Sequence, residues 1–540
     1  MNAWIAAAIG FPLVLLLGCV SARARARLPA LLPIAPLPAL LAVVFGASDA
    51  PLVLGNARFA LVFGFDAPGR ILLGCAALLW IAAGASAAGY LRGRQDRGGF
   101  VVSWLLALTG CVGVFLAADV VGFYFLLAVL SVGASGLVLQ GQGPEALRAG
   151  AVYLGVALLA EAFLLAALVL MVQDAPEGSL LIRDVAGAVA TSPRRDLALT
   201  LLIIGLGMKA GLVPLHFWMP WAYGAAPIPA AAVMSGAVVK ASVLALLRLL
   251  PAEVALPDFG LPLAALGLFG ALYGALIGLT QANPKVVLAY SSVSQMGFLL
   301  AVLGMGLASG DPATAWVVTF YAAHHLLVKG GLFLWVGALP SGRRALGWPM
   351  WLPGAFIALG LAGLPLTGGA LAKYAAKDLL GDGAAYLAAT ASSLTSTLLM
   401  LHFLRRLVVA ADASATPATA LPRWPWFAMA TASVIVPWWL YVAIPIGPLQ
   451  AALAPAALWS SLWPVLAGAA LALALGLLRR GAPIAVLPAG DVGLALQALG
   501  RAGTRVGAVF QHGDAVARRW PVASVSLLLV VAIFYWTMRP

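Results

Sequence analysis

The chain has 540 residues, of which 63% are hydrophobic and only 9% are charged, and its mean hydropathy is +1.04. This composition leaves too little polar surface to cover a soluble globular protein, so it indicates a polytopic membrane protein. The net charge of +13 does not indicate nucleic-acid binding, because the arginines are scattered through short loops rather than gathered on one polar face.

Apolar runs of about twenty residues, the length that crosses the hydrocarbon core as a helix, recur along the whole chain. They predict an all-α fold with about 16 transmembrane helices. The expected spans are 3–20, 30–47, 71–91, 100–118, 120–140, 150–172, 196–213, 228–249, 261–280, 284–307, 314–338, 350–372, 383–404, 426–446, 458–478 and 521–537. The insert 481–520 is less apolar and fits either a short amphipathic helix on the cytoplasmic side or a solvated loop.

Arginines mark the side of the membrane on which each loop lies. The loops after odd-numbered spans carry arginines such as Arg23, Arg92 and Arg343, whereas the loops after even-numbered spans are acidic or mixed. Because positively charged loops stay in the cytoplasm, both termini are expected outside it. The expected location is the inner (plasma) membrane of a bacterium.

Lysine is rare and concentrated. The chain has six lysines, all between Lys209 and Lys377, and five of them lie in or beside apolar segments. An ammonium group can lose its proton in a low-dielectric site whereas a guanidinium cannot, so lysines at membrane depth indicate proton movement. Codon bias toward arginine, with a few structural lysines, is the alternative explanation.

Two apolar segments contain helix-breaking residues beside a lysine. The first, 207–220, holds Lys209, His216 and two prolines, and the second, 364–373, ends at Lys373. Broken helices are tolerated at membrane depth where the freed backbone lines a cavity, and paired breaks point to inverted repeats. A proline kink with a snorkelling lysine is the alternative for the first segment.

The paired breaks suggest a division of the chain. The expected parts are 1–99 with helices one to three, 100–250 and 260–405 as two inverted half-channel repeats, and 420–540 with the last three helices. The halves would contain helices four to eight and nine to thirteen.

Other ionisable residues lie deep within the predicted spans. Lys240 is at the middle of its span, where insertion of a lysine costs about 2.5 to 3.5 kcal/mol. His325 and Lys329 are four residues apart and share a helix face, with His324 beside them, so imidazole could relay protons to the amine. His402 stands alone in its span, as either a relay member or a packing histidine.

Glu161 is the acid that occupies the middle of an apolar span, among 18 acidic residues in the chain. A buried acid there requires a basic partner, and Lys209 is the preferred one, although a purely structural ion pair is the alternative. The sequence has no Walker loop, HExxH motif, cysteine cluster or Rossmann fingerprint in context. We therefore expect no cofactor, no metal site and no catalytic centre in this chain.

These motifs resemble the antiporter-like membrane subunits shared by respiratory complex I, Mrp-type sodium/proton antiporters and membrane-bound hydrogenases. The resemblance spans roughly 100–405 and is carried by 209–220, Lys240 in its small-residue helix, 285–297, the His325 and Lys329 pair, and 365–373. It implies that Lys209 is the central lysine of the first half-channel and that Lys240 connects the halves. It also implies that His325 and Lys329 continue the axis and that Lys373 lies near the exit.

One position departs from the family pattern. The family usually carries a glutamate in the fifth helix, where this chain has Ala128, and whether Glu161 replaces it is open. The resemblance implies proton translocation, with sodium exchange as an option, inside a complex of several membrane subunits such as a quinone oxidoreductase or a hydrogenase. The alternatives are a proton-driven subunit of an inorganic-carbon (bicarbonate or CO2) uptake complex and a non-conducting scaffold.

Overall fold

The structure is a computed structural model of the chain. It describes residues 3–46, 50–56, 59–94, 97–141, 143–251, 253–339, 347–413 and 421–481. Apart from Gly481, the predicted insert 481–520 and the last predicted span, 521–537, lie outside the described residues.

Helices make up almost all of the regular structure in these ranges. They are α1 (Ala3–Gly18), α2 (Ala22–Leu31), α3 (Leu37–Phe45), α4 (Ala67–Tyr90), α5 (Gly98–Leu116), α6 (Val120–Leu139), α7 (Gly143–Gln173), η1 (Pro176–Gly178), α8 (Ile182–Val189), α9 (Arg195–Ala210), α10 (Trp218–Ala225), α11 (Ile228–Val233), η2 (Met234–Val238), α12 (Val239–Leu249), α13 (Pro257–Gly278), α14 (Pro284–Ser309), α15 (Thr314–Ala338), α16 (Trp348–Ala362), α17 (Gly368–Ala375), α18 (Lys377–Leu380), α19 (Ala384–Ala413), α20 (Arg423–Ala443), α21 (Leu449–Ala452) and α22 (Pro455–Gly481).

Within the described ranges, 11 helices are long and apolar enough to cross a membrane, and α1 and α16 are shorter apolar helices. The predicted all-α polytopic fold is thereby confirmed. The count of sixteen spans and the relation between two inverted repeats stay predictions.

A β-hairpin, which the sequence analysis did not predict, joins α3 to α4. Strands β1 (Leu52–Asn56) and β2 (Phe59–Phe63) pair antiparallel, with Leu52 opposite Phe63. The amide of Val62 donates to a carboxylate oxygen of Asp119 at 2.7 Å, and its carbonyl accepts from Ala118. The hairpin is therefore tied to the turn between α5 and α6.

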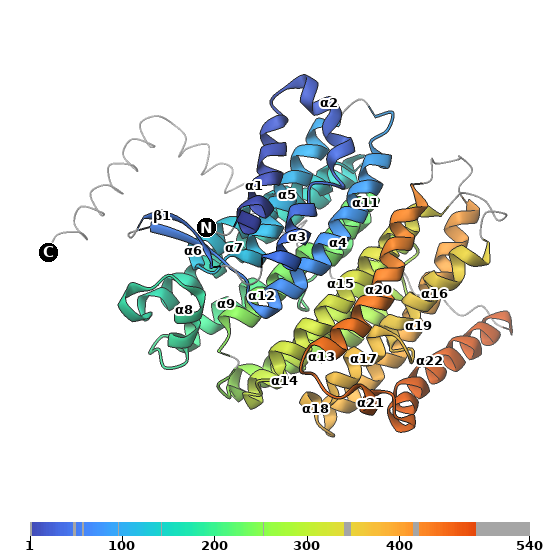
Figure 1. Ribbon diagram of the computed structural model, residues 1–540. Coiled ribbons are helices and arrows are strands. Elements are labelled where there is room, and N and C mark those ends of the chain that lie inside the picture. Colours follow the sequence, from blue (N-terminus) through green and yellow to red (C-terminus); the bar gives the residue numbers. More distant parts are fainter. Residues whose placement is uncertain are drawn as a thin grey trace, which may run out of the picture. The chain divides into compact units, whose positions relative to one another are not determined.

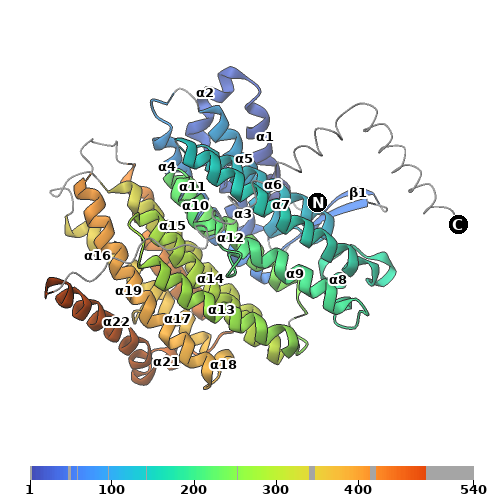
Figure 2. The ribbon, with the colours of Figure 1, turned by 180° about the vertical axis from the view of Figure 1, so that it is seen from behind.

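Helices α14 and α15 form the centre of the described part, and Figures 1 and 2 show them beside α13. Buried residues make up 94% of the apolar window of α14 and all of that of α15. Helices α13 and α14 pack closely because glycines face each other; a Cβ atom on Gly267 would lie 2.6 Å from the amide nitrogen of Ala301. Close packing through small residues is typical of membrane helices, and it encloses the polar residues of α14 and α15.

Both helix breaks expected from the sequence are present. Helix α9 ends at Gly211, which has the left-handed φ of 83°, and the chain continues as α10 only at Trp218. Helix α16 ends at Gly363, with φ 104°, and α17 begins after Thr367, whose hydroxyl caps it. Glycine ends helices in this way because it adopts positive φ without a steric penalty.

Candidate functional site

Lys209 lies at the end of α9, directly before the first break. Its ammonium nitrogen is 2.9 Å from Oε1 of Glu161 on α7 and 2.7 Å from the hydroxyl of Ser131 on α6. Gly205 allows α9 to approach α7, since a Cβ atom there would lie 2.8 Å from the carbonyl oxygen of Ala160. The side chains of Lys209 and Glu161 are only 11% and 8% exposed, so this is a buried ion pair with the partner that the sequence analysis preferred.

Ala128, at the position where the family usually has its acid, lies on α6 one turn before Ser131. The carboxylate that meets Lys209 therefore comes from the next helix along the chain. The amine keeps an acidic partner even though the fifth-helix position is alanine.

A small cavity extends from Lys209 toward the next lysine. It has a volume of about 30 Å³ and is lined by Lys209, Ser131 and Tyr153 on one side and by Val239 and Ser242 on the other. Because roughly 10 to 15 Å³ is enough for one water molecule at a polar site, the cavity can hold water between Lys209 and the helix that carries Lys240.

Lys240 contacts a histidine directly. Its ammonium nitrogen lies 2.6 Å from Nδ1 of His325 and 3.4 Å from the carbonyl oxygen of Ser235, and all three residues are fully buried. The π-helical turn η2 directly precedes α12, and such turns mark functional sites in many helices. The contact between Lys240 and His325 therefore joins α12 to α15, across 85 positions of the sequence.

A second connection runs between Lys240 and Lys329 through hydroxyl and carbonyl oxygens. Lys329 donates to the carbonyl oxygen of Leu288 at 2.9 Å, and the hydroxyl of Ser292 also contacts that oxygen, at 3.2 Å. The hydroxyls of Ser292 and Ser235 lie 2.9 Å apart, and the carbonyl of Ser235 accepts from Lys240. Sequence reasoning missed both serines; the signal was a pair of small polar residues inside apolar spans.

His324 faces the second helix break. Its ring lies against the start of α17, because a Cβ atom on Gly368 or Gly369 would lie 2.6 and 3.0 Å from its two nitrogens. Neither nitrogen has a hydrogen-bond partner among the described residues, although the side chain is buried. Buried polar groups without protein partners are places where internal water binds.

A buried hydrogen-bond chain links three helices near this point. The hydroxyl of Tyr321 on α15 donates to Gln295 on α14 at 2.6 Å, and Gln295 donates to Ser396 on α19 at 3.2 Å. Sequence reasoning did not select these residues, because each is a single neutral polar residue in an apolar helix. Their contacts place a polar path between α15 and the helix that contacts Lys373.

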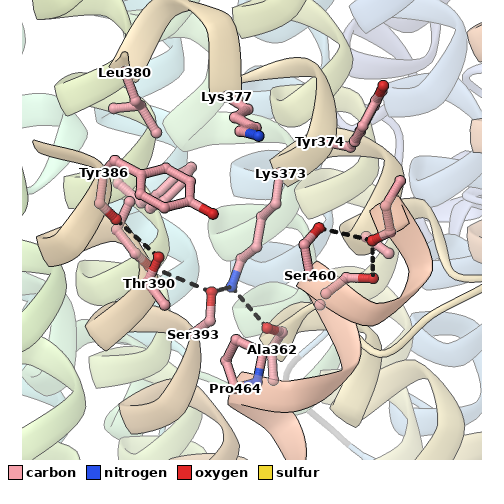
Figure 3. Close-up of a pocket in the computed structure, with 16 residues that line it drawn as sticks. Ala362, Lys373, Tyr374, Lys377, Leu380, Tyr386, Thr390, Ser393, Ser460 and Pro464 are labelled. Atoms are coloured by element: carbon pink, nitrogen blue, oxygen red, sulfur yellow. Dashed lines mark hydrogen bonds between the residues drawn. The ribbon is translucent and has the colours of Figure 1, made fainter. Parts of the chain in front are cut away.

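Lys373, in α17, is the last lysine along the series Lys209, Lys240, Lys329 and Lys373 (Figure 3). Its ammonium nitrogen donates to the carbonyl oxygen of Ala362 and to the hydroxyl of Ser393, both at 2.8 Å. It lines a cavity of about 70 Å³ that also contains Tyr386 and Thr390 from α19 and Ser460 from α22. The second break thus holds a lysine in a polar cavity, bonded to neutral oxygen atoms.

The two remaining candidate histidines lie in other surroundings. His216 is buried in the first break, with its ring edge-on to Tyr273 at 5.1 Å between centroids. His402 lies 2.8 Å from the carbonyl oxygen of Gln281, in the turn between α13 and α14. At 1.5 Å per residue, His402 is about 14 Å along α19 from Ser393.

The fold and this buried row define a polytopic helical membrane protein of the antiporter-like type. A family model described as NADH:quinone oxidoreductase/Mrp antiporter, TM matches residues 117–346. NADH-quinone oxidoreductase subunit N of Cereibacter sphaeroides is 32% identical over 327 residues, which cover 59% of this chain and 71% of that protein. The chain belongs to this family.

Other relatives match over a smaller part of their length. Subunit N of Desulforudis audaxviator is 33% identical, over 53% of this chain and 60% of that protein. Hydrogenase-4 component B of Escherichia coli is 32% identical, over 47% of this chain and 39% of that protein. The chain thus spans less than two thirds of these two relatives.

Solved structures show the same fold. A chain of the Mrp complex from a Dietzia species superposes with a TM-score of 0.75 at 23% identity, covering 99% of this chain and 63% of that chain. A chain of respiratory complex I from Thermus thermophilus with bound aureothin has a TM-score of 0.64 at 26% identity, covering 82% of this chain and 97% of that chain.

Proposed function

We propose that the chain is a proton-translocating membrane subunit of a larger energy-coupling complex. One observation carries the proposal: buried ionisable side chains follow one another from Glu161 and Lys209 through Lys240 and His325 to Lys329. Isolated charges at membrane depth are costly, and such residues mark ion and proton pathways.

Each group has a proposed role that follows from its contacts. Glu161 balances the ammonium of Lys209, so breaking this pair frees Lys209 to release a proton. His325 meets Lys240 nitrogen to nitrogen, an arrangement suited to proton exchange. His324 and Lys373 are proposed to continue the path toward the cavity beside α22. His216, which lies edge-on to Tyr273, and His402, which contacts the carbonyl oxygen of Gln281, stay proposed members of the path.

The family and the membrane topology support a wider proposal. Its relatives are named as subunits or components of oxidoreductase and hydrogenase complexes, so we propose other membrane subunits as partners. We also propose a bacterial inner membrane as the location, and the arginine distribution supports placing both termini outside the cytoplasm. The two half-channels 100–250 and 260–405 are proposed to be inverted repeats around the two breaks.

The other functions are not favoured. A non-conducting scaffold does not require Lys240, His325 and Lys329 to be fully buried, with Lys240 in contact with His325. The relatives described above do not favour an inorganic-carbon uptake subunit, because they are named as oxidoreductase and hydrogenase subunits or components. The experiment below distinguishes sodium/proton exchange from proton translocation alone.

The test measures proton flux in vesicles that contain the chain with its co-purified subunits. Lys209→Ala and Lys240→Ala should abolish flux while assembly survives, and Lys240→Arg should do so too, because a guanidinium keeps its proton. Arg183→Ala is the control, since it removes a cationic side chain that is 83% exposed and lines neither cavity. Unchanged flux in both alanine variants, or full activity with arginine, would contradict the proposal. Dependence of flux on sodium would identify exchange.

A further inference from the structure

A cavity between α4 and α20 has a volume of about 750 Å³. Helices α3, α4, α15 and α20 surround it, and these helices lie together in Figure 1. Most of its lining is apolar, from residues such as Val43, Ile71, Leu78 and Val436, and two polar side chains, Asp66 and Arg70, are at one end.

The cavity has the depth of one membrane leaflet. Arg70 and Leu78 are eight residues apart on α4, which is about 12 Å along the helix axis. Val436 and Ile444 line the cavity over the same length at the end of α20. Because half of the hydrocarbon core is about 15 Å thick, the cavity extends from the level of Arg70 most of the way to the middle of the bilayer.

Two side chains in the lining are of the kind that concentrates at the membrane interface. Trp316 and Trp439 line the cavity, and Trp439 is 67% exposed. Tryptophan concentrates at the level of lipid headgroups. The polar end therefore lies where the headgroup of a bound lipid would lie.

Arg70 carries the only uncompensated charge in this lining. Its Nε donates to the carbonyl of Val43 at 2.9 Å, and it forms no ion pair with any described residue. The neighbouring Asp66 is already bound by two nitrogens of Arg248, at 2.7 and 2.9 Å. The guanidinium of Arg70 is exposed and suited to a phosphate group.

We propose that this cavity binds a membrane phospholipid, with its phosphate on Arg70 and one acyl chain along α4 and α20. Small residues make the room for the chain: Gly74 and Cys75 on α4 and Ala443 on α20 all line the cavity. A transmembrane helix of a partner would not need a positive charge at the rim. The cavity shares no lining residue with the proposed proton path.

The test quantifies bound phospholipid by native mass spectrometry of the chain purified in mild detergent with its co-purified subunits. Phosphatidylglycerol is added as the probe, and one tightly held molecule is expected. Arg70→Ala should weaken its binding about tenfold, and Arg70→Lys should keep part of the affinity. Ala443→Trp should exclude the acyl chain, because this exposed alanine can be enlarged without disturbing the core.

The matched control is Arg423→Ala, which removes an exposed arginine at the other end of α20 and should leave binding unchanged. Proton flux is measured on the same preparations. Loss of phospholipid binding does not require loss of proton flux, so the two measurements test the lipid site and the proposed function separately. Undiminished phospholipid binding in both Arg70→Ala and Ala443→Trp would overturn the proposal. So would a photo-cross-link from position 443 to a partner subunit's helix in the assembled complex.

Discussion

The two broken helices hold their lysines in different ways. At the first break, Lys209 is paired with the carboxylate of Glu161 beside a cavity of about 30 Å³. At the second, Lys373 is bonded to a carbonyl and a hydroxyl oxygen beside a cavity of about 70 Å³. A carboxylate balances the charge of an ammonium group, whereas neutral oxygens only solvate it. Similar backbone breaks therefore create one site in which a carboxylate balances the ammonium charge and one in which only neutral oxygens solvate it.

Replacing the acidic side chain of Glu161 should have the largest effect on proton flux among these predictions, because it removes the difference between the two lysine sites. Glu161→Gln keeps the shape but leaves Lys209 with only neutral partners, like Lys373. We expect proton flux in vesicles to fall by about tenfold or more, a barrier increase of roughly 1.4 kcal/mol. Glu145→Gln, in the first turn of the same helix, is the control and should not change flux. Wild-type flux in Glu161→Gln would make the pair purely structural.

Moving the acid should restore part of the function. Ala128 lies one turn from Ser131, which contacts Lys209, so a glutamate at position 128 should reach the amine from α6. The double variant Ala128→Glu with Glu161→Ala should regain a large part of the flux that Glu161→Ala alone loses. If the double variant is as inactive as the single one, the acid must come from α7 for a reason other than charge.

Hydroxyl deletions should show a smaller and unequal effect. Ser393→Ala removes one of the two oxygens that hold Lys373, so flux should fall about threefold, consistent with the net value of one hydrogen bond. Ser131→Ala should have a weaker effect, because Glu161 still holds Lys209. Flux measured side by side in the two variants tests the comparison, and the reverse order of effects would contradict it.

The smallest effect on flux is expected at Arg248, which holds elements together rather than moving protons. It binds Asp66 and the carbonyls of Val114, Phe115 and Ala117, and so joins α12 to the ends of α4 and α5. Arg248→Ala should destabilise the protein by about 2 kcal/mol and lower its melting temperature in detergent without changing flux per folded molecule.

The same contact predicts a pH dependence. Burial by itself would raise the pKa of Asp66, but the adjacent guanidinium of Arg248 lowers the pKa below its usual value. The carboxylate therefore contributes stability at pH values above the unfolded pKa of about 3.9. That contribution is lost as the pH falls through the lower folded pKa. Arg183→Ala is the control, since its ion pair with Asp184 is exposed and should contribute little.

The sequence predicted segments that overlap all 11 candidate spans of the described residues, both breaks, and the Glu161 and Lys209 pair. Charges and prolines are rare in apolar helices, so each is informative. The predicted span 30–47 instead contains the turn between α2 and α3. It did not predict the neutral part of the site. Serine and threonine in helices often bond to their own helix, as Thr109 does to Leu105, so their sequence pattern does not show which ones reach a neighbouring helix. The hairpin was missed because strands of five residues give too short a pattern.

Main-chain oxygens form part of the link between Lys240 and Lys329, through Ser235 and Leu288. No side-chain substitution removes a main-chain oxygen, so point mutations leave this part of the link in place. For example, Ser292→Ala removes a hydroxyl, but the carbonyl oxygen of Leu288 still accepts from Lys329. Alanine scanning would therefore understate the importance of this stretch. A proline or a one-residue insertion in α14 would redirect the backbone itself and reveal how much conduction depends on it.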